Sequence, residues 1–118
     1  MPCVKDLLDN RRSIDSVVLF GIESHVCILQ TALDLLEQNY QVHVLADGVS
    51  SCNREEVPIA LAQIQQAGGC VTTSETVVFQ FQQTTESPQW KSMFPIMKEE
   101  KGNTAKAVRK LVQFRSAL

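Results

Sequence analysis

A cysteine that follows a buried strand is the first candidate for chemistry in this sequence. The segment GIESHVC, from Gly21 to Cys27, comes directly after a run of β-branched and aromatic residues and leads into a helical pattern. The unpaired amides and dipole at a helix start favour a thiolate, and they could also stabilise an oxyanion in acyl transfer. A lone cysteine near a helix start is also commonly a buried small residue, so both interpretations stay open on the residues alone.

The remaining cysteines and the histidines have no spacing typical of a metal site. Those cysteines are Cys3, Cys52 and Cys70, and they form no CxxC pair and have no histidine at zinc spacing, so no metal or other cofactor is predicted. His25 lies two residues before Cys27, and side chains so spaced on a helix point apart. We therefore interpret His25 as a pocket-lining or packed residue and His43 as a partly buried strand residue.

The elements that must position Cys27 alternate between strands and helices. Strand-like runs cover residues 16–22, 42–46 and 70–73, and helical patterns cover residues 4–12, 25–39, 54–68 and 89–100. Asp47-Gly48 is expected to end the second strand, Pro95 to interrupt the last helix, and Ser24 to cap the second helix. Residues 74–83 fit a strand or a helix equally well. Such alternation predicts an α/β fold with a parallel sheet and right-handed crossovers.

The number of strands is small for such a sheet. The strand at 16–22 is so uniformly apolar that it is typical of a central strand, covered on both faces and paired on both edges. Only three strands can be identified in the 118 residues, and no linker or repeat indicates a second domain. The sequence therefore predicts one half of a doubly wound domain.

Composition excludes several classes of protein. The chain is 44% hydrophobic with a net charge of −2, which is typical of a globular domain and not of a disordered chain. No apolar run approaches the roughly 20 residues of a membrane span, and the first residues lack a secretory signal pattern, so a cytoplasmic protein is expected, with the nucleus and the mitochondrion left open. The balance of 13 acidic and 11 basic residues does not favour nucleic acid. The basic tail at about 101–118 is interpreted as a solvated helix face or a frayed terminus.

One long run makes the sequence recognisable. The run VVLFGIESHVCILQTALDLLEQNYQVHVLADGVSS, with the later segments VTTSE and SPQWK, resembles the isochorismatase-like cysteine hydrolase family. Its core is a strand followed by G-I-x-[ST]-x-x-C and a helix containing T-A-L-D-L-L, and the resemblance covers nearly the whole chain. It implies a three-layer α/β/α fold with a six-stranded parallel sheet, of which about three strands and their helices are present here.

The resemblance also implies the site. Cys27 matches the catalytic nucleophile of a hydrolase that acts on a small amide or vinyl-ether type substrate. The family commonly has a cis peptide at the bond that corresponds to Ile22–Glu23. The backbone amides of Glu23 and Cys27 would form the oxyanion hole, and the Ser24 side chain would line the substrate pocket.

The departures from the family pattern concern the partners of the nucleophile. The family's Asp base and orienting Lys come from segments that precede those present here. The nearest candidates are Lys5, Asp6, Asp9 and Asp15, and we expect them at the amino end of the first strand, opposite Cys27. One of these residues, Glu75 or any lysine close to Cys27 would contradict that expectation. Cys52 replaces a basic residue of the family, with Arg54 two positions later, and Asp47 is interpreted as a turn former or helix cap rather than a substrate ligand.

Two functional hypotheses follow. The first is a hydrolase domain that supplies Cys27 and the oxyanion amides but is catalytically incompetent alone, being the carboxyl-terminal half, residues 1–118, of a longer protein whose substrate is a small molecule. The second is a non-catalytic interaction or regulatory fragment. Its apolar first strand, at Val17–Phe20, would pair with a protein partner or with a second copy of the chain.

Overall fold

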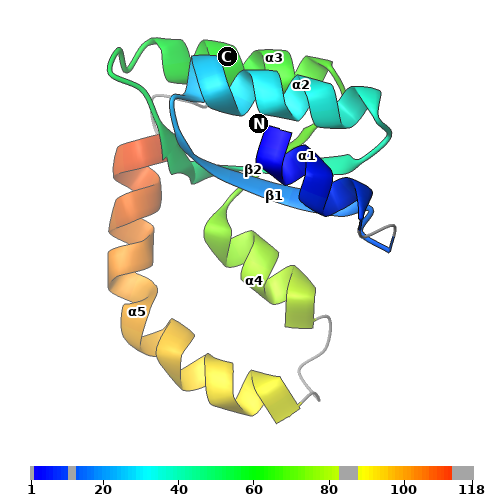
Figure 1. Ribbon diagram of the computed structural model, residues 1–118. Helices are drawn as coiled ribbons and strands as arrows, with labels where there is room; N and C mark the ends of the chain where they lie inside the picture. The colour runs from blue at the N-terminus through cyan, green and yellow to red at the C-terminus, as the bar shows by residue number, and fades with distance from the viewer. Residues whose placement is uncertain (1, 11–12, 83–87, 113–118) are drawn as a thin grey trace.

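The computed structural model describes residues 2–10, 13–82 and 88–112, and the side chains from Asp6 onward within those ranges (Figure 1). Its elements, in chain order, are α1 (Pro2–Asp9), β1 (Ser16–Ile22), the π-helix η1 (Ser24–Ile28), α2 (Leu29–Glu37), β2 (Gln41–Ser50), α3 (Glu56–Gln66), β3 (Cys70–Thr72), α4 (Ser74–Gln82) and α5 (Pro88–Val112). The three strands form one parallel sheet in the order β1-β2-β3. The predicted α/β class and parallel sheet are confirmed.

Helices lie on both faces of the sheet and give the three layers. Figure 1 shows α2 and α3 side by side over one face, with α4 and α5 on the other. β1 alternates its side chains between these faces, as a strand must. Val17 and Leu19 pack against the core under α2 and α3, while Phe20 and Ile22 are 68% and 67% exposed.

β2 is longer than predicted. It does not end at Asp47-Gly48 but runs to Ser50, because a bulge absorbs those residues. Leu19 of β1 pairs with Val44, and Gly21, two residues later, pairs with Val49, so β2 carries three extra residues in this interval. Bulges of this kind redirect side chains near the end of a strand. The turn residues therefore sit inside the strand and not after it.

The structure decides one open assignment and corrects one expectation among the helices. Residues 74–82, where the pattern was ambiguous, form α4. α5 is one 25-residue helix that continues through Pro95, although proline removes a donor from the helical ladder. Figure 1 shows α5 curving along its length. The end of the basic tail, residues 113–118, lies outside the described residues, and residues 101–112 belong to α5, where most side chains are exposed.

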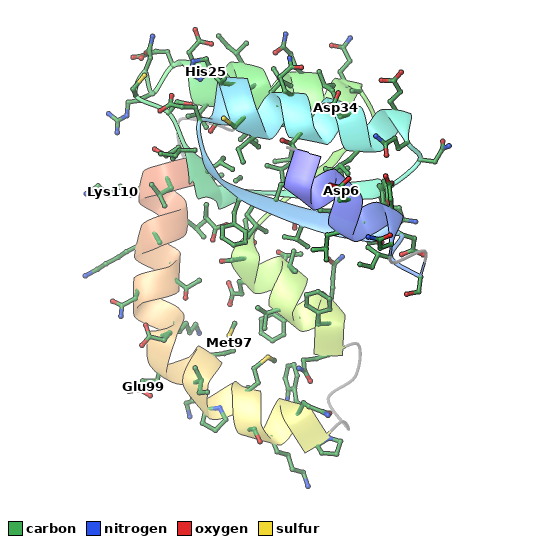
Figure 2. All side chains as sticks on the ribbon, viewed as in Figure 1. Asp6, His25, Asp34, Met97, Glu99 and Lys110 are labelled. Atoms are coloured by element: carbon green, nitrogen blue, oxygen red, sulfur yellow. The ribbon has the colours of Figure 1, made fainter. Side chains whose placement is uncertain are left out.

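The aromatic residues of α4 and α5 contact one another but none is buried. The rings of Phe79 and Trp90 lie 5.4 Å apart, and those of Trp90 and Phe94 lie 5.8 Å apart. Figure 2 shows Met97 of α5 on the side of this helix that faces α4. Among the described residues of these two helices no side chain is fully buried. The layer formed by α4 and α5 is therefore packed loosely, with its side chains accessible to solvent.

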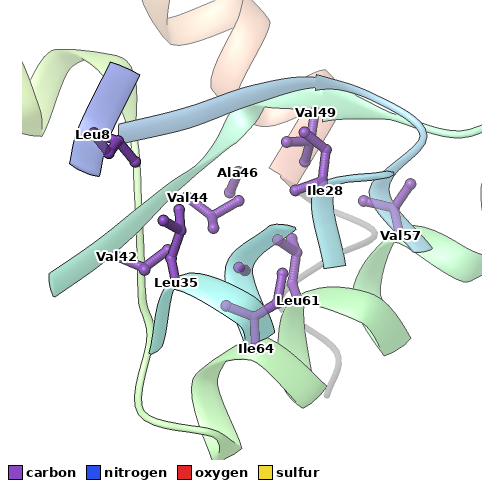
Figure 3. Packing of buried hydrophobic residues seen from close by; sticks show 11 residues of the cluster. Leu8, Ile28, Leu35, Val42, Val44, Ala46, Val49, Val57, Leu61 and Ile64 are labelled. Carbon is purple, nitrogen blue, oxygen red and sulfur yellow. The ribbon is translucent and has the colours of Figure 1, made fainter. Parts of the chain in front are cut away.

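The core lies on the other face, between the sheet and the helices α2 and α3 (Figure 3). Its buried apolar residues include Val42, Val44 and Ala46 from alternate positions of β2, which face Leu35 of α2 and Ile64 of α3. Val44 and Ile64 are fully buried. Each such side chain contributes about 1.5–3 kcal/mol through removal of apolar surface from water. This core holds the carboxyl ends of β1 and β2 together, where the candidate site lies.

Candidate active site

Cys27 lies just beyond the carboxyl end of β1, the edge of a parallel sheet where ligand sites are usually found. The strand ends at Ile22, and Cys27 is the fourth residue of η1, which leads into α2. Its side chain is exposed and forms no disulfide. π-helical turns of this kind are rare and frequently occur at functional sites. An accessible thiol is thus placed at the expected edge of the sheet.

The backbone before Cys27 has two unusual features. Gly21 has a φ of 123°, a value that side chains with a Cβ rarely adopt. The Ile22–Glu23 peptide bond is cis, as the family resemblance implied. After this bond the carbonyl of Glu23 accepts hydrogen bonds from the amides of Val26 and Ile28, at 3.2 and 3.1 Å. The chain therefore leaves the strand and enters the helix within a few residues.

Hydrogen bonds join this turn to the end of β2. Ser24 donates its N–H to Ser51 Oγ at 3.1 Å and its hydroxyl to the Ser50 carbonyl at 3.0 Å. His25 Nδ1 lies 3.0 Å from Ser51 Oγ. The amide of Cys52 donates to Glu23 Oε2 at 3.1 Å. We call these two segments, Glu23–His25 and Ser50–Cys52, the paired loops.

The geometry gives each predicted site residue a place. Ser24 is fully buried. Its hydroxyl binds the Ser50 carbonyl at the end of β2 and does not cap the helix. The cap expectation was wrong, because the Ser50 carbonyl takes the hydroxyl instead. The Glu23 carboxylate is partly exposed and binds the Cys52 amide. The oxyanion role of the Glu23 and Cys27 amides and the pocket-lining role of Ser24 stay predictions.

The carboxylates near the start of the chain lie at the other end of the sheet. Asp9 and Asp15 line an open cavity of about 490 Å³ together with Gln38, Asn39 and Tyr40, which stand where α2 ends and β2 begins. Asp6 lies on α1, and Figure 2 shows it well apart from His25. This is the amino-end position that the sequence predicted. The side chain of Lys5 lies outside the described residues.

Asp47 has a structural partner. Its carboxylate accepts the N–H of Ser74 at 2.9 Å and the Ser74 hydroxyl through its other oxygen. Ser74 begins α4, so Asp47 satisfies an amide that the helix itself leaves unpaired. Asp47 therefore caps a helix, but a distant one, and the expectation of a local turn former was wrong because Asp47 lies within β2. The bulge of β2 is what directs this carboxylate to a helix 27 residues away in sequence.

The most important residue that sequence reasoning missed is Ser51. The signal that could have found it is positional, because a polar pair, Ser50-Ser51, stands at the end of the strand that neighbours β1 in a parallel sheet. Cys52 and Arg54 are both exposed. In the parts of the chain that the structure describes, no three metal-ligating side chains gather. Within the same parts, no helix is long and apolar enough to span a bilayer.

Known proteins share both the sequence and this fold. Residues 4–76 match the isochorismatase domain family. The chain is 41% identical over 99 residues to mouse isochorismatase domain-containing protein 2A, a match that covers 84% of this chain and 48% of the mouse protein. The chain belongs to the isochorismatase domain family.

Solved structures agree with the family assignment. A Caenorhabditis elegans protein described as MAR1 ribonuclease superposes with a TM-score of 0.71 and 39% identity, over 78% of this chain and 46% of its own. An isochorismatase-like hydrolase from Alkaliphilus metalliredigens gives a TM-score of 0.60 and 31% identity, over 65% of this chain and 42% of its own. The fold is therefore the three-layer α/β/α fold of isochorismatase-like proteins. The chain spans about half the length of the curated relatives it matches.

Proposed function

We propose that this chain is the nucleophile-bearing part of an isochorismatase-like hydrolase domain, with Cys27 as the nucleophile and a small amide or vinyl-ether type compound as the substrate. The observation that supports this most is the exposed thiol of Cys27 on a turn anchored by the paired loops. For an amide, the sulfur would attack the carbonyl carbon, and the amine would leave with a proton. Water would then hydrolyse the thioester, releasing the acid and restoring the thiol.

The oxyanion would be stabilised by backbone amides. We assign this role to the N–H groups of Glu23 and Cys27, which flank the turn after β1. Preorganised donors of this kind cost little rearrangement during the reaction, and removing one commonly costs about 10²–10³ in kcat. The hydrogen bonds of Ser24 support such preorganisation. Ser24 lies between Glu23 and Cys27 in the sequence, it is buried, and its bonds to Ser50 and Ser51 hold this part of the turn in place.

Catalysis by this chain alone is limited by proton transfer. The acids Asp9 and Asp15 line the cavity at the opposite end of the sheet, and Asp47 already binds Ser74. General acid–base catalysis contributes roughly 10²–10⁴ in rate. We therefore propose that these 118 residues by themselves turn over substrate slowly or not at all, although Cys27 remains chemically reactive.

Selective alkylation of the cysteines tests the nucleophile directly. Cys27, Cys52 and Cys70 are all exposed, so accessibility alone predicts similar rates for the three thiols. If Cys27 is the nucleophile, we expect it to react about tenfold faster than the other two with limiting iodoacetamide at neutral pH, because catalytic cysteines are selectively reactive; mass spectrometry assigns the modified sites. Equal rates in the folded protein would contradict the nucleophile assignment. A panel of small primary amides, tested with Cys27→Ser as control, measures turnover separately.

A second candidate function is self-association through β1. This strand is at the edge of the described sheet, and its Phe20 and Ile22 side chains are largely exposed. An apolar edge strand presents unpaired backbone groups to another strand. We propose that a second copy of the chain is the partner.

A further inference from the structure

The hydroxyl of Ser51 joins two groups on the turn that carries Cys27. Its Oγ accepts the N–H of Ser24 at 3.1 Å and lies 3.0 Å from Nδ1 of His25. A serine hydroxyl has one hydrogen and two lone pairs, and a backbone N–H can only donate. The 3.0 Å distance to Nδ1 of His25 fits either direction of this bond, and donation by Ser51 is the direction that also gives the hydroxyl hydrogen an acceptor among the described residues.

A hydroxyl that donates to Nδ1 would fix the tautomer of the imidazole. A neutral imidazole that accepts at Nδ1 carries its proton on Nε2. Glu23 is less suited to set the ring, because its Oε2 lies 3.9 Å from Nδ1 and already accepts the Cys52 amide. At 3.9 Å the contact is longer than a hydrogen bond. Of these two groups, only Ser51 Oγ lies within hydrogen-bond distance of Nδ1.

We propose that Ser51 is a positioning residue for Cys27, which it serves by holding the first turn of η1 against the end of β2 and by fixing His25 as the Nε2–H tautomer. Ser24, His25 and Cys27 all belong to the five-residue η1. Hydrogen bonds to Ser24 and His25 therefore also constrain the position of Cys27. The proposal rests on the proposed function, in which Cys27 is the nucleophile. It assigns Ser51, the residue that follows β2, a part in the chemistry at the end of β1.

The imidazole is tested by NMR on the protein labelled with ¹⁵N in histidine. His43, on β2, serves as an internal reference. In the wild-type protein we expect His25 to show a protonated Nε2 and a hydrogen-bonded, unprotonated Nδ1 at neutral pH. Ser51→Ala should shift the Nδ1 resonance of His25 toward that of a free imidazole. Ser51→Thr should preserve it, because threonine keeps the hydroxyl.

The matched control is Ser50→Ala. Ser50 participates through its backbone carbonyl only, so removal of its hydroxyl should leave the His25 spectrum unchanged. A wild-type His25 with its proton on Nδ1 would overturn the proposal. This arm needs no variant, so it decides the question even if Ser51→Ala does not fold.

The positioning role is tested by the alkylation rate of Cys27, measured relative to Cys70 in the same molecule. Ser51→Ala removes both hydrogen bonds of the hydroxyl and should lower this relative rate at least about fivefold, the factor that corresponds to one ordinary hydrogen bond of about 1 kcal/mol. Ser51→Thr and Ser50→Ala should leave it within about twofold. Circular dichroism confirms that each variant is folded.

The outcomes separate the two proposals. A wild-type Cys27 that reacts fast, with no change in Ser51→Ala, would overturn the role of Ser51 and leave the nucleophile assignment standing. A wild-type Cys27 that reacts no faster than Cys70 would contradict the nucleophile assignment, and the role of Ser51 with it. A fast Cys27 that slows in Ser51→Ala and recovers in Ser51→Thr supports both.

Discussion

The turn that carries Cys27 depends on the backbone of Gly21. This glycine has a φ of 123° at the point where β1 resumes its pairing with β2, after the bulge. A Cβ at this position would meet only the end of the Ile28 side chain, at 3.9 Å, so space is available and the backbone conformation is what excludes other residues. The requirement is local, yet it orients the whole following turn.

Gly21→Ala should therefore destabilise the protein through backbone strain. The expected loss in the free energy of unfolding is about 1–3 kcal/mol, measured by urea denaturation followed by circular dichroism. The matched control is Gly102→Ala on α5, where the added Cβ has no neighbour within 4 Å and φ is not positive. There alanine should be neutral or stabilise the helix by up to about 1 kcal/mol. Equal effects of the two substitutions would show that the conformation of Gly21 is not needed.

At the scale of elements, the bulge of β2 connects three parts of the fold. Its extra residues include Asp47, which binds the first residue of α4, and the strand then continues to Ser50 and the paired loops. α4 has no buried residue among those described, so packing supplies little of its stability. The carboxylate of Asp47 is the main described polar contact that fixes the start of this helix to the sheet.

Asp47→Ala should loosen α4 more than the rest of the molecule. Loss of a helix-capping side chain typically costs about 0.5–2 kcal/mol. We expect the amides of α4 to exchange with deuterium at least about fivefold faster, with the core strands β1 and β2 changed little. Asp34→Ala, an exposed site on α2, is the control and should leave α4 unchanged. Unchanged exchange in α4 after Asp47→Ala would refute this role of the carboxylate.

At the scale of the whole molecule, one face of the sheet is well covered and the other is open. The radius of gyration is 15.4 Å, compared with about 13.5 Å for a compact domain of this length. The large exposed apolar side chains of the open half are Phe20, Ile22, Phe79, Phe81, Phe94, Ile96 and Leu111. Exposed apolar surface of this kind marks interaction sites or promotes aggregation.

Self-association through β1 can be measured by analytical ultracentrifugation over a range of concentrations. Phe20→Glu adds a charge to the exposed edge strand and should weaken association by at least about tenfold, or about 1.4 kcal/mol. Ile59→Glu is the control, because Ile59 is 48% exposed on α3, away from the edge. A wild-type protein that stays monomeric throughout, or equal weakening by both substitutions, would contradict pairing through β1.

Much of the fold could be predicted because the patterns that determine it are local. The continuous apolar run of β1 and the three- and four-residue spacing of Leu29, Leu33 and Leu36 indicate a strand and a helix from a few neighbours each. Cys27 could be chosen because it follows that strand directly. Pro95 misled the prediction, since a proline in the exposed interior of a long helix removes one hydrogen bond without ending the helix.

The sequence by itself determined the order of elements, the parallel sheet and the place of Cys27 at the carboxyl end of β1. Only the tertiary structure decided that β2 continues through Asp47, that Asp47 binds Ser74, and that Ser51 joins Ser24 to His25. The physical reason is distance along the chain. Each of these bonds connects residues 26 or 27 positions apart, and their geometry depends on the register between neighbouring strands, which no local pattern specifies.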